Sequence, residues 1–183
     1  MMMLIILSIV ILVLLILMVF VSIYNKFQSY LVRINEAEAS IDAILRQRFD
    51  LLNRSINVIN SHIENDEDKK NVLSMIVKLR SRKISNFELD RILYDAINEF
   101  NEYKDCYAEL HHNESFIKID ANLNETEIEI YALRKYYNDV ITGYNKLVRK
   151  IPSNIVAKVF KYKLKPYFDG KDMEDEDIKD FKL

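Results

Sequence analysis

The stretch IDANLNETEIEIYALRKYYNDVITGYNKLVRKI, residues 119–151, carries the longest unbroken repeat in the chain. Mostly apolar residues recur in it at alternating steps of four and three residues, which is the spacing of one face of an α-helix. We call such a row of residues a seam. Pro152 ends this pattern, because proline lacks the backbone N–H that a helix interior needs. Only helices packed side by side at shallow angles need so long a seam, so the stretch predicts a helical bundle. The seam consists of Ile119, Leu123, Thr126, Ile130, Leu133, Tyr137, Val140, Tyr144, Leu147 and Ile151.

Two further seams precede this one; the second keeps the same step, and the first keeps it as far as Leu52 and then slips by one step to Ile56. A capping box at Ser85-Asn86-Phe87-Glu88 predicts the start of the helix that carries the second of them. A shorter amphipathic helix around residues 72–79 either forms a separate antiparallel helix of the bundle or runs on collinearly with the helix after it. The first seam comprises Phe27, Leu31, Ile34, Glu38, Ile41, Leu45, Arg48, Leu52, Ile56, Ile59 and Ile63, and the second comprises Leu89, Leu93, Ala96, Phe100, Tyr103, Tyr107 and Leu110.

The N-terminal residues 1–23, MMMLIILSIVILVLLILMVFVSI, contain no charge, no glycine and no proline. A helix of this length is roughly 35 Å long, enough to cross a hydrocarbon core of about 30 Å. The stretch lacks the basic n-region and the small-residue cleavage site of a secretory signal peptide, so we expect an uncleaved signal anchor. No helix breaker separates it from the first seam, and the span and the first bundle helix are expected to form one continuous helix.

Lys26 and Arg33 follow the span, and no basic residue precedes it. The positive-inside rule therefore places the N-terminus outside the cell membrane and the remainder of this single-pass protein in the cytoplasm. The single cysteine, Cys106, excludes an internal disulfide.

Composition supports an all-α fold, because two glycines and two prolines in 183 residues leave few breaks for strands and tight turns. We predict an N-terminal transmembrane helix followed by a long antiparallel up-and-down bundle of about four helices. The predicted organisation is a signal anchor at 1–23, a bundle with a basic and aromatic C-terminal segment at 24–168, and an acidic, disordered tail at 169–183.

Specific residues, concentrated between Asn113 and Phe168, form an ordered series: Tyr24-Asn25, Ser40-Ile41-Asp42, Arg48-Phe49-Asp50-Leu51, Asn113-Glu114-Ser115-Phe116, Glu125-Thr126-Glu127, Arg134-Lys135-Tyr136-Tyr137-Asn138, Val140, Tyr144-Asn145, Pro152-Ser153-Asn154-Ile155, Phe160 and Pro166-Tyr167-Phe168. On these residues, the chain resembles the LemA family over essentially its whole length. The resemblance implies a single-span membrane protein with an α-helical bundle and no established enzymatic activity. Two positions depart from the family pattern: Glu38 stands where a tryptophan is frequent, and Asn53 where a proline is common.

Two charged residues, Glu38 and Arg48, interrupt the first apolar seam. An unpaired charge inside a bundle would cost several kcal/mol, so each is expected to meet an opposite charge or to lie where the bundle is open. They form either a polar layer that fixes the helix register or a small polar site inside the bundle, with Arg134 as a candidate partner.

A row of polar residues lies beside the seam of the last long helix. Successive members of the row are seven, four and seven residues apart, which keeps them within one narrow angular range around the helix axis. The row is either a structural hydrogen-bonded element or a strip that binds a partner protein. It consists of Glu127, Arg134, Asn138 and Asn145.

The segment 151–168 alternates lysines with apolar and aromatic residues. Ser153 is the expected N-cap of a short helix, whose apolar residues either cover the end of the bundle or enter a membrane interface while the lysines meet anionic headgroups. The candidates for lipid contact are Lys158, Phe160, Lys161, Lys163 and Lys165.

Catalytic and metal-binding patterns point away from an enzyme. Glu109-Leu110-His111-His112 contains one Glu-x-x-His, but a di-metal bundle needs a second copy and two further inward glutamates. No serine or cysteine lies in a glycine-bearing turn of the kind that nucleophiles use. We therefore expect no catalytic residues, no metal and no cofactor. The mixed charge, net −2, argues against nucleic acid as a partner.

The sequence thus favours a membrane-anchored, non-catalytic protein with an interaction or scaffold role. Its protein partner is not identified by the sequence, and its long seams also allow a homo-oligomer. The alternative is a lipid-binding, membrane-organising protein that acts through the basic aromatic segment 151–168.

Overall fold

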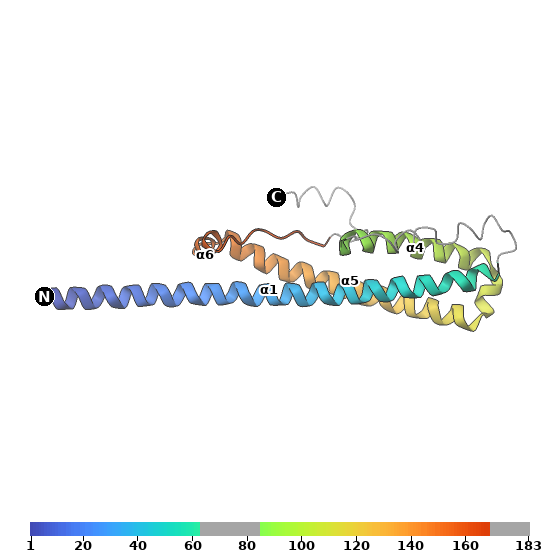
Figure 1. The fold of residues 1–183 in the computed structure, drawn as a ribbon, viewed down its shortest axis with the longest axis horizontal. Coiled ribbons are helices and arrows are strands. Elements are labelled where there is room, and N and C mark those ends of the chain that lie inside the picture. Colours follow the sequence, from blue (N-terminus) through green and yellow to red (C-terminus); the bar gives the residue numbers. More distant parts are fainter. Residues whose placement is uncertain (63–84, 169–183) are drawn as a thin grey trace. The chain divides into compact units, whose positions relative to one another are not determined.

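The computed structural model describes residues 1–62 and 85–168 (Figure 1). Within these residues all regular secondary structure is helical, which confirms the predicted all-α class. The predicted short helix at 72–79 and the acidic tail at 169–183 lie outside the described residues. The elements are α1 (Met2–Asn60), α4 (Asn86–Cys106), the 3-10 helix η1 (Ala108–His112), α5 (Glu114–Arg149) and α6 (Ser153–Val159).

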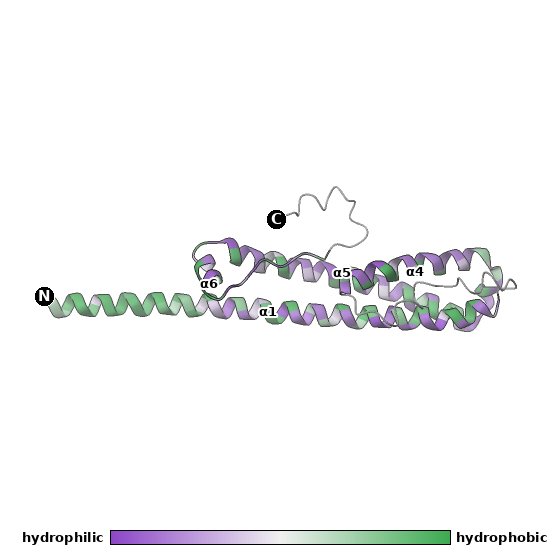
Figure 2. Ribbon diagram, turned by 45° about the horizontal axis from the view of Figure 1, so that its top comes forward, coloured by the Kyte–Doolittle hydropathy of each residue, from purple (hydrophilic) through white to green (hydrophobic). Residues whose placement is uncertain are grey.

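Helix α1 continues without a break from the apolar N-terminal residues to Asn60, as the absence of a helix breaker predicted. Figure 2 shows the ribbon of its N-terminal part in hydrophobic green over most of its length. The side chains of this strongly apolar part of α1 are not buried inside the protein. Among the described helices, α1 is therefore the one that is long and apolar enough to span a membrane.

The chain divides into two compact units, and both α1 and α5 contribute to each of them. The first unit contains residues 1–37 and 136–167, and the second contains, among the described residues, 38–62, 85–135 and Phe168. Each unit has its own core of buried side chains.

Helices α4 and α5 run antiparallel in the second unit. Phe100 stacks on Phe116 with ring centroids 4.7 Å apart, and Lys104 pairs with Asp120 at 2.8 Å. Side-chain caps begin both helices: the Ser85 hydroxyl accepts the Glu88 N–H, and Asn113 Oδ1 accepts the Phe116 N–H. Together with α1 and η1, these helices contribute the buried core of the second unit, which includes Ile41, Leu45, Leu52, Ile59, Leu93, Ala96, Phe100, Leu110, Phe116, Leu123 and Ile130.

The predicted helical seam through Tyr107 and Leu110 is wrong at its end. The α-helix stops at Cys106 because Tyr107 adopts an extended backbone, with φ −117° and ψ 91°. Leu110 is nevertheless fully buried, since the short helix η1 returns it to the core.

The first unit is built on Phe27 of α1, which is fully buried. Its ring meets Tyr144 of α5 edge-on at 5.9 Å and packs against Tyr162 at 4.7 Å. Gly143 allows α1 and α5 to approach closely, because a Cβ there would lie 2.5 Å from the ring of Tyr30.

Ser153 does not act as the N-cap that the sequence predicted. Pro152 occupies that position, and the buried Ser153 hydroxyl lies 2.7 Å from the carbonyl oxygens of both Leu147 and Lys150. The last carbonyls of a helix have no partner within the helix, so a hydroxyl donor just beyond its end satisfies them. Ser153 therefore closes α5 instead of opening α6.

Candidate functional site

Four charged side chains from three helices meet inside the second unit, and we call this group the charged cluster: Arg48 of α1, Asp90 of α4, and Glu127 and Arg134 of α5. Arg134 Nη2 donates to both carboxylate oxygens of Asp90, at 2.6 and 2.5 Å. Arg48 Nη1 lies 3.9 Å from Asp90 Oδ1, and Arg48 Nη2 pairs with Glu127. Arg48, Asp90 and Arg134 expose only 0%, 1% and 6% of their surface. The cluster therefore ties three helices together through buried charge.

Burial dominates the electrostatics of Arg48. Desolvation lowers the pKa of its guanidinium from its ordinary value to about 10, while Asp90 opposes this shift and Arg134 adds to it. Arg48 stays charged at neutral pH, and its Nε donates to Thr126 Oγ1 at 3.3 Å. Arg48 Nη1 and Arg134 Nε are buried without a hydrogen-bond partner in the part of the chain that the structure describes.

Phe168 covers one side of the charged cluster. The Arg134 guanidinium lies over its ring at 5.9 Å, and the ring packs against Phe87 at 4.6 Å. Contact between a cation and an aromatic face adds to the stabilisation of a desolvated guanidinium. Ion pairs, a hydroxyl and an aromatic face thus surround the two arginines inside the second unit.

A second group of contacts holds the chain that follows α6, residues 160–167, which we call the return segment (Figure 1). The side-chain amide of Asn145 binds the backbone of Lys165 through both of its polar atoms. Nδ2 donates to the Lys165 carbonyl at 2.9 Å, and Oδ1 accepts the Lys165 N–H at 3.0 Å. Gln28 Nε2 donates to the Tyr162 hydroxyl at 2.7 Å. The return segment is thus fastened to both α1 and α5 within the first unit.

Aromatic rings join the start of the return segment to the apolar N-terminal stretch. The ring of Phe160 lies 4.7 Å from that of Tyr24 and 6.0 Å from that of Phe20. Phe20 belongs to the apolar residues 1–23, and Tyr24 directly follows them. We call Phe20, Tyr24, Phe160 and Tyr162 the aromatic collar; the Phe160 and Tyr162 rings stack at 5.9 Å. The collar places Phe160 at the level where the apolar part of α1 ends.

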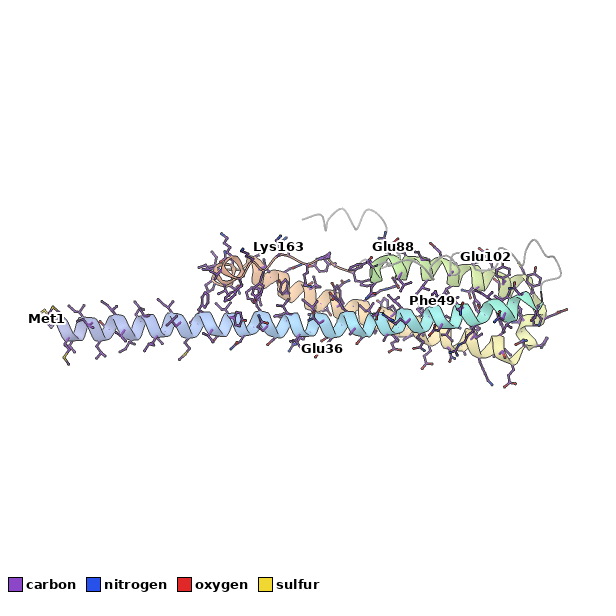
Figure 3. The ribbon with its side chains drawn as sticks, in the orientation of Figure 1. Met1, Glu36, Phe49, Glu88, Glu102 and Lys163 are labelled. Atoms are coloured by element: carbon purple, nitrogen blue, oxygen red, sulfur yellow. The ribbon has the colours of Figure 1, made fainter. Side chains whose placement is uncertain are left out.

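Exposed apolar and basic side chains surround the aromatic collar. Ile155 and Val159 lie four residues apart on α6 and expose 57% and 60% of their surface, and Phe160 exposes 43%. The side chains of Lys158, Lys161 and Lys163 are exposed, and that of Lys165 is half-buried. Figure 3 labels Lys163 on the return segment. The geometry therefore combines apolar, aromatic and cationic groups at the end of the apolar stretch.

The LemA family model matches residues 37–180, which is most of the chain. The chain belongs to the LemA family. This confirms the resemblance seen in the sequence. No curated protein matches this LemA-family chain. The matched region contains the charged cluster, α6 and the return segment, whereas the apolar residues 1–23 precede it.

The charged cluster of this LemA-family protein was only partly predicted. Arg48 and Arg134 were proposed as partners, and the structure brings them together through Asp90, which the sequence reasoning missed. Two signals in the sequence point to Asp90. Two buried arginines require a buried acid, and Asp90 lies three residues before the seam residue Leu93, which places both on the same face of the helix. Glu38 is half-buried on α1.

The polar row proposed on α5 divides between the two units. Glu127 and Arg134 belong to the charged cluster, and Asn145 binds the return segment. Asn138 is half-buried, and its carbonyl accepts the Thr142 hydroxyl at 2.9 Å. Nη2 of Arg134 and the side-chain amide of Asn145 are thus already engaged within the chain.

No group of three or more His, Cys, Asp or Glu side chains that could hold a metal ion occurs among the described residues. Glu109 and His112, the Glu-x-x-His pair, are both exposed. Cys106 is exposed at the end of α4.

Proposed function

We propose that this LemA-family protein is a single-span, non-catalytic membrane protein that contacts its own bilayer at two places. The first contact is the apolar stretch 1–23, which serves as an uncleaved anchor. The second is α6 together with the exposed residues of the aromatic collar. The packing of Phe160 against Phe20 and Tyr24 carries this proposal. The basic residues Lys26 and Arg33, which follow the span, favour a cytoplasmic side for both contacts.

The depth of Phe160 follows from its partner. If residues 1–23 cross the hydrocarbon core, Phe20 lies near its edge, and a ring that packs on Phe20 lies there too. Aromatic rings prefer this interfacial depth, where one end of the ring is apolar and the other is wet. Ile155 and Val159 then gain about 1 kcal/mol each by leaving water, which is part of the value for full burial.

Helix α6 is only about 10 Å long, too short to bind a membrane as a free peptide. The return segment and α5 hold it beside a span that is already inserted, so its membrane contact is intramolecular and needs little affinity of its own. The element therefore suits a protein that senses or organises the membrane surface around its anchor.

A tryptophan reporter tests the second contact. The chain has no tryptophan, so Phe160→Trp in the full-length protein gives a single indole emitter. In bilayers of brominated phosphatidylcholine, we expect its fluorescence to be quenched to nearly the same extent as that of Phe20→Trp, because both rings lie at the hydrocarbon edge.

Val32→Trp is the matched negative control. Val32 is exposed on α1, the helix that also carries Phe20, and it lies nine residues and about 14 Å beyond Ile23. A tryptophan at this position should therefore be quenched little. If Phe160→Trp is quenched no more than Val32→Trp, the second membrane contact does not exist.

A scaffold role that binds a partner protein is the second candidate. It is favoured by Ile128 and Tyr131, which are exposed three residues apart on α5 in the second unit. Exposed large apolar side chains on one helix face suit a protein partner or a second copy of the chain. This role needs the α5 face, whereas the membrane contact needs α6, so the two proposals depend on different residues.

A further inference from the structure

The turn that ends α6 has an unusual residue at its sharpest point. Lys161 has a φ of 58°, and among the described residues it is the one non-glycine residue with a positive φ. The Tyr162 N–H donates to the Ala157 carbonyl at 2.9 Å, and the Lys161 N–H donates to the Lys158 carbonyl at 3.3 Å. These two bonds form a Schellman motif, in which the left-handed position normally belongs to glycine.

A lysine at this position lowers stability relative to glycine, because its Cβ crowds the backbone in the left-handed region. Backbone strain that persists in a fold is frequently associated with function. The strained residue belongs to a turn that carries three exposed lysines, Lys158, Lys161 and Lys163, and Lys161 directly follows Phe160 in the sequence.

We infer that this turn, residues 158–163, binds the phosphate of an anionic lipid headgroup, with Lys158, Lys161 and Lys163 supplying the positive charge. The inference rests on the proposed function, because it requires α6 to lie at the bilayer surface. Phe160 sets the depth of the turn through Phe20 and Tyr24, and headgroup phosphates lie just outside that depth. Neighbouring lysines at that depth select anionic over zwitterionic lipids.

The test measures which lipid surrounds the Phe160→Trp reporter in the full-length protein. Brominated phosphatidylglycerol and brominated phosphatidylcholine are compared at equal mole fraction, and their quenching ratio gives the local enrichment of the anionic lipid. We expect enrichment with Lys161 present, and a loss of about two- to fivefold on Lys161→Gly, since one basic residue near an anionic surface contributes about that factor.

Lys161→Arg is the charge-preserving control and should keep the enrichment. Lys161→Gly should also raise the melting temperature by about 2–4 °C, because glycine relieves the left-handed backbone. A variant that is more stable and yet less selective for anionic lipid distinguishes a binding role from a structural one.

The possible failures are distinct. If both lipids quench the reporter but enrichment is absent, or is unchanged in Lys161→Gly, or is lost equally in Lys161→Arg, the headgroup site is wrong and the membrane contact stands. If neither lipid quenches the reporter, the proposed function fails and the headgroup site fails with it.

Discussion

Replacing Asp90 with asparagine is expected to lower the free energy of unfolding by about 3–5 kcal/mol. Asp90 is the buried acid that faces both buried arginines, with Arg134 hydrogen-bonded to it and Arg48 3.9 Å away. Without its charge, the two buried guanidiniums repel each other, and Arg48 keeps its ion pair with the half-buried Glu127 while Arg134 loses its hydrogen-bonded carboxylate. Thermal denaturation of the full-length protein in detergent, followed by circular dichroism, should show a fall in melting temperature of about 6–20 °C.

Asp105→Asn is the matched control, since Asp105 lies exposed on the same helix, and we expect it to change stability by less than about 0.5 kcal/mol. Replacing Asp90 and Arg134 together with leucine removes the ion pair and leaves Arg48 with Glu127. This double variant should recover about 2 kcal/mol relative to Asp90→Asn. If Asp90→Asn is no more destabilising than Asp105→Asn, the charged cluster does not hold the helices together.

Phe27→Ala is the second substitution with a large expected effect, a loss of about 3–5 kcal/mol. Phe27 is fully buried between Tyr144 and Tyr162, so its removal leaves a cavity in the core of the first unit and takes away two aromatic contacts. Tyr162 also anchors the return segment, and its loosening should make Lys163 more accessible to trypsin. The same denaturation experiment, with limited proteolysis beside it, measures both effects.

Val32→Ala tests whether the effect is specific to burial. Val32 lies five residues further along α1 and is 55% exposed, so its truncation should stay within about 0.5 kcal/mol of the unchanged protein. Equal stabilities for Phe27→Ala and Val32→Ala would mean that Phe27 is not the core residue of this unit.

Local pattern made the long helices predictable. The step of four and three residues placed Phe27, Leu45, Leu52, Leu123 and Ile130 on the seams, and all of them are buried. The capping residue Ser85 was also visible, because its signal lies within four consecutive residues. Such features depend on neighbours along the chain, and no knowledge of the tertiary structure is needed to recognise them.

Contacts between distant parts of the chain were not predictable in the same way. Asp90 pairs with Arg134 across 44 positions, and Gln28 pairs with Tyr162 across 134. These pairs depend on how the helices are aligned, which a seam alone does not specify. The role of Ser153 was missed for a related reason: a hydroxyl at a helix boundary can satisfy either the helix before it or the helix after it.

The depth of Ile155 in a bilayer tests the central claim most directly. A nitroxide label at Ile155→Cys, in a full-length protein whose single cysteine is removed by Cys106→Ser, reports collisions with dissolved oxygen and with a water-soluble nickel reagent. Our account predicts frequent oxygen collisions and shielding from nickel, in contrast to the same label at Val32→Cys. Nickel collisions as frequent at position 155 as at position 32 would contradict it, because α6 would then lie in water rather than at the membrane.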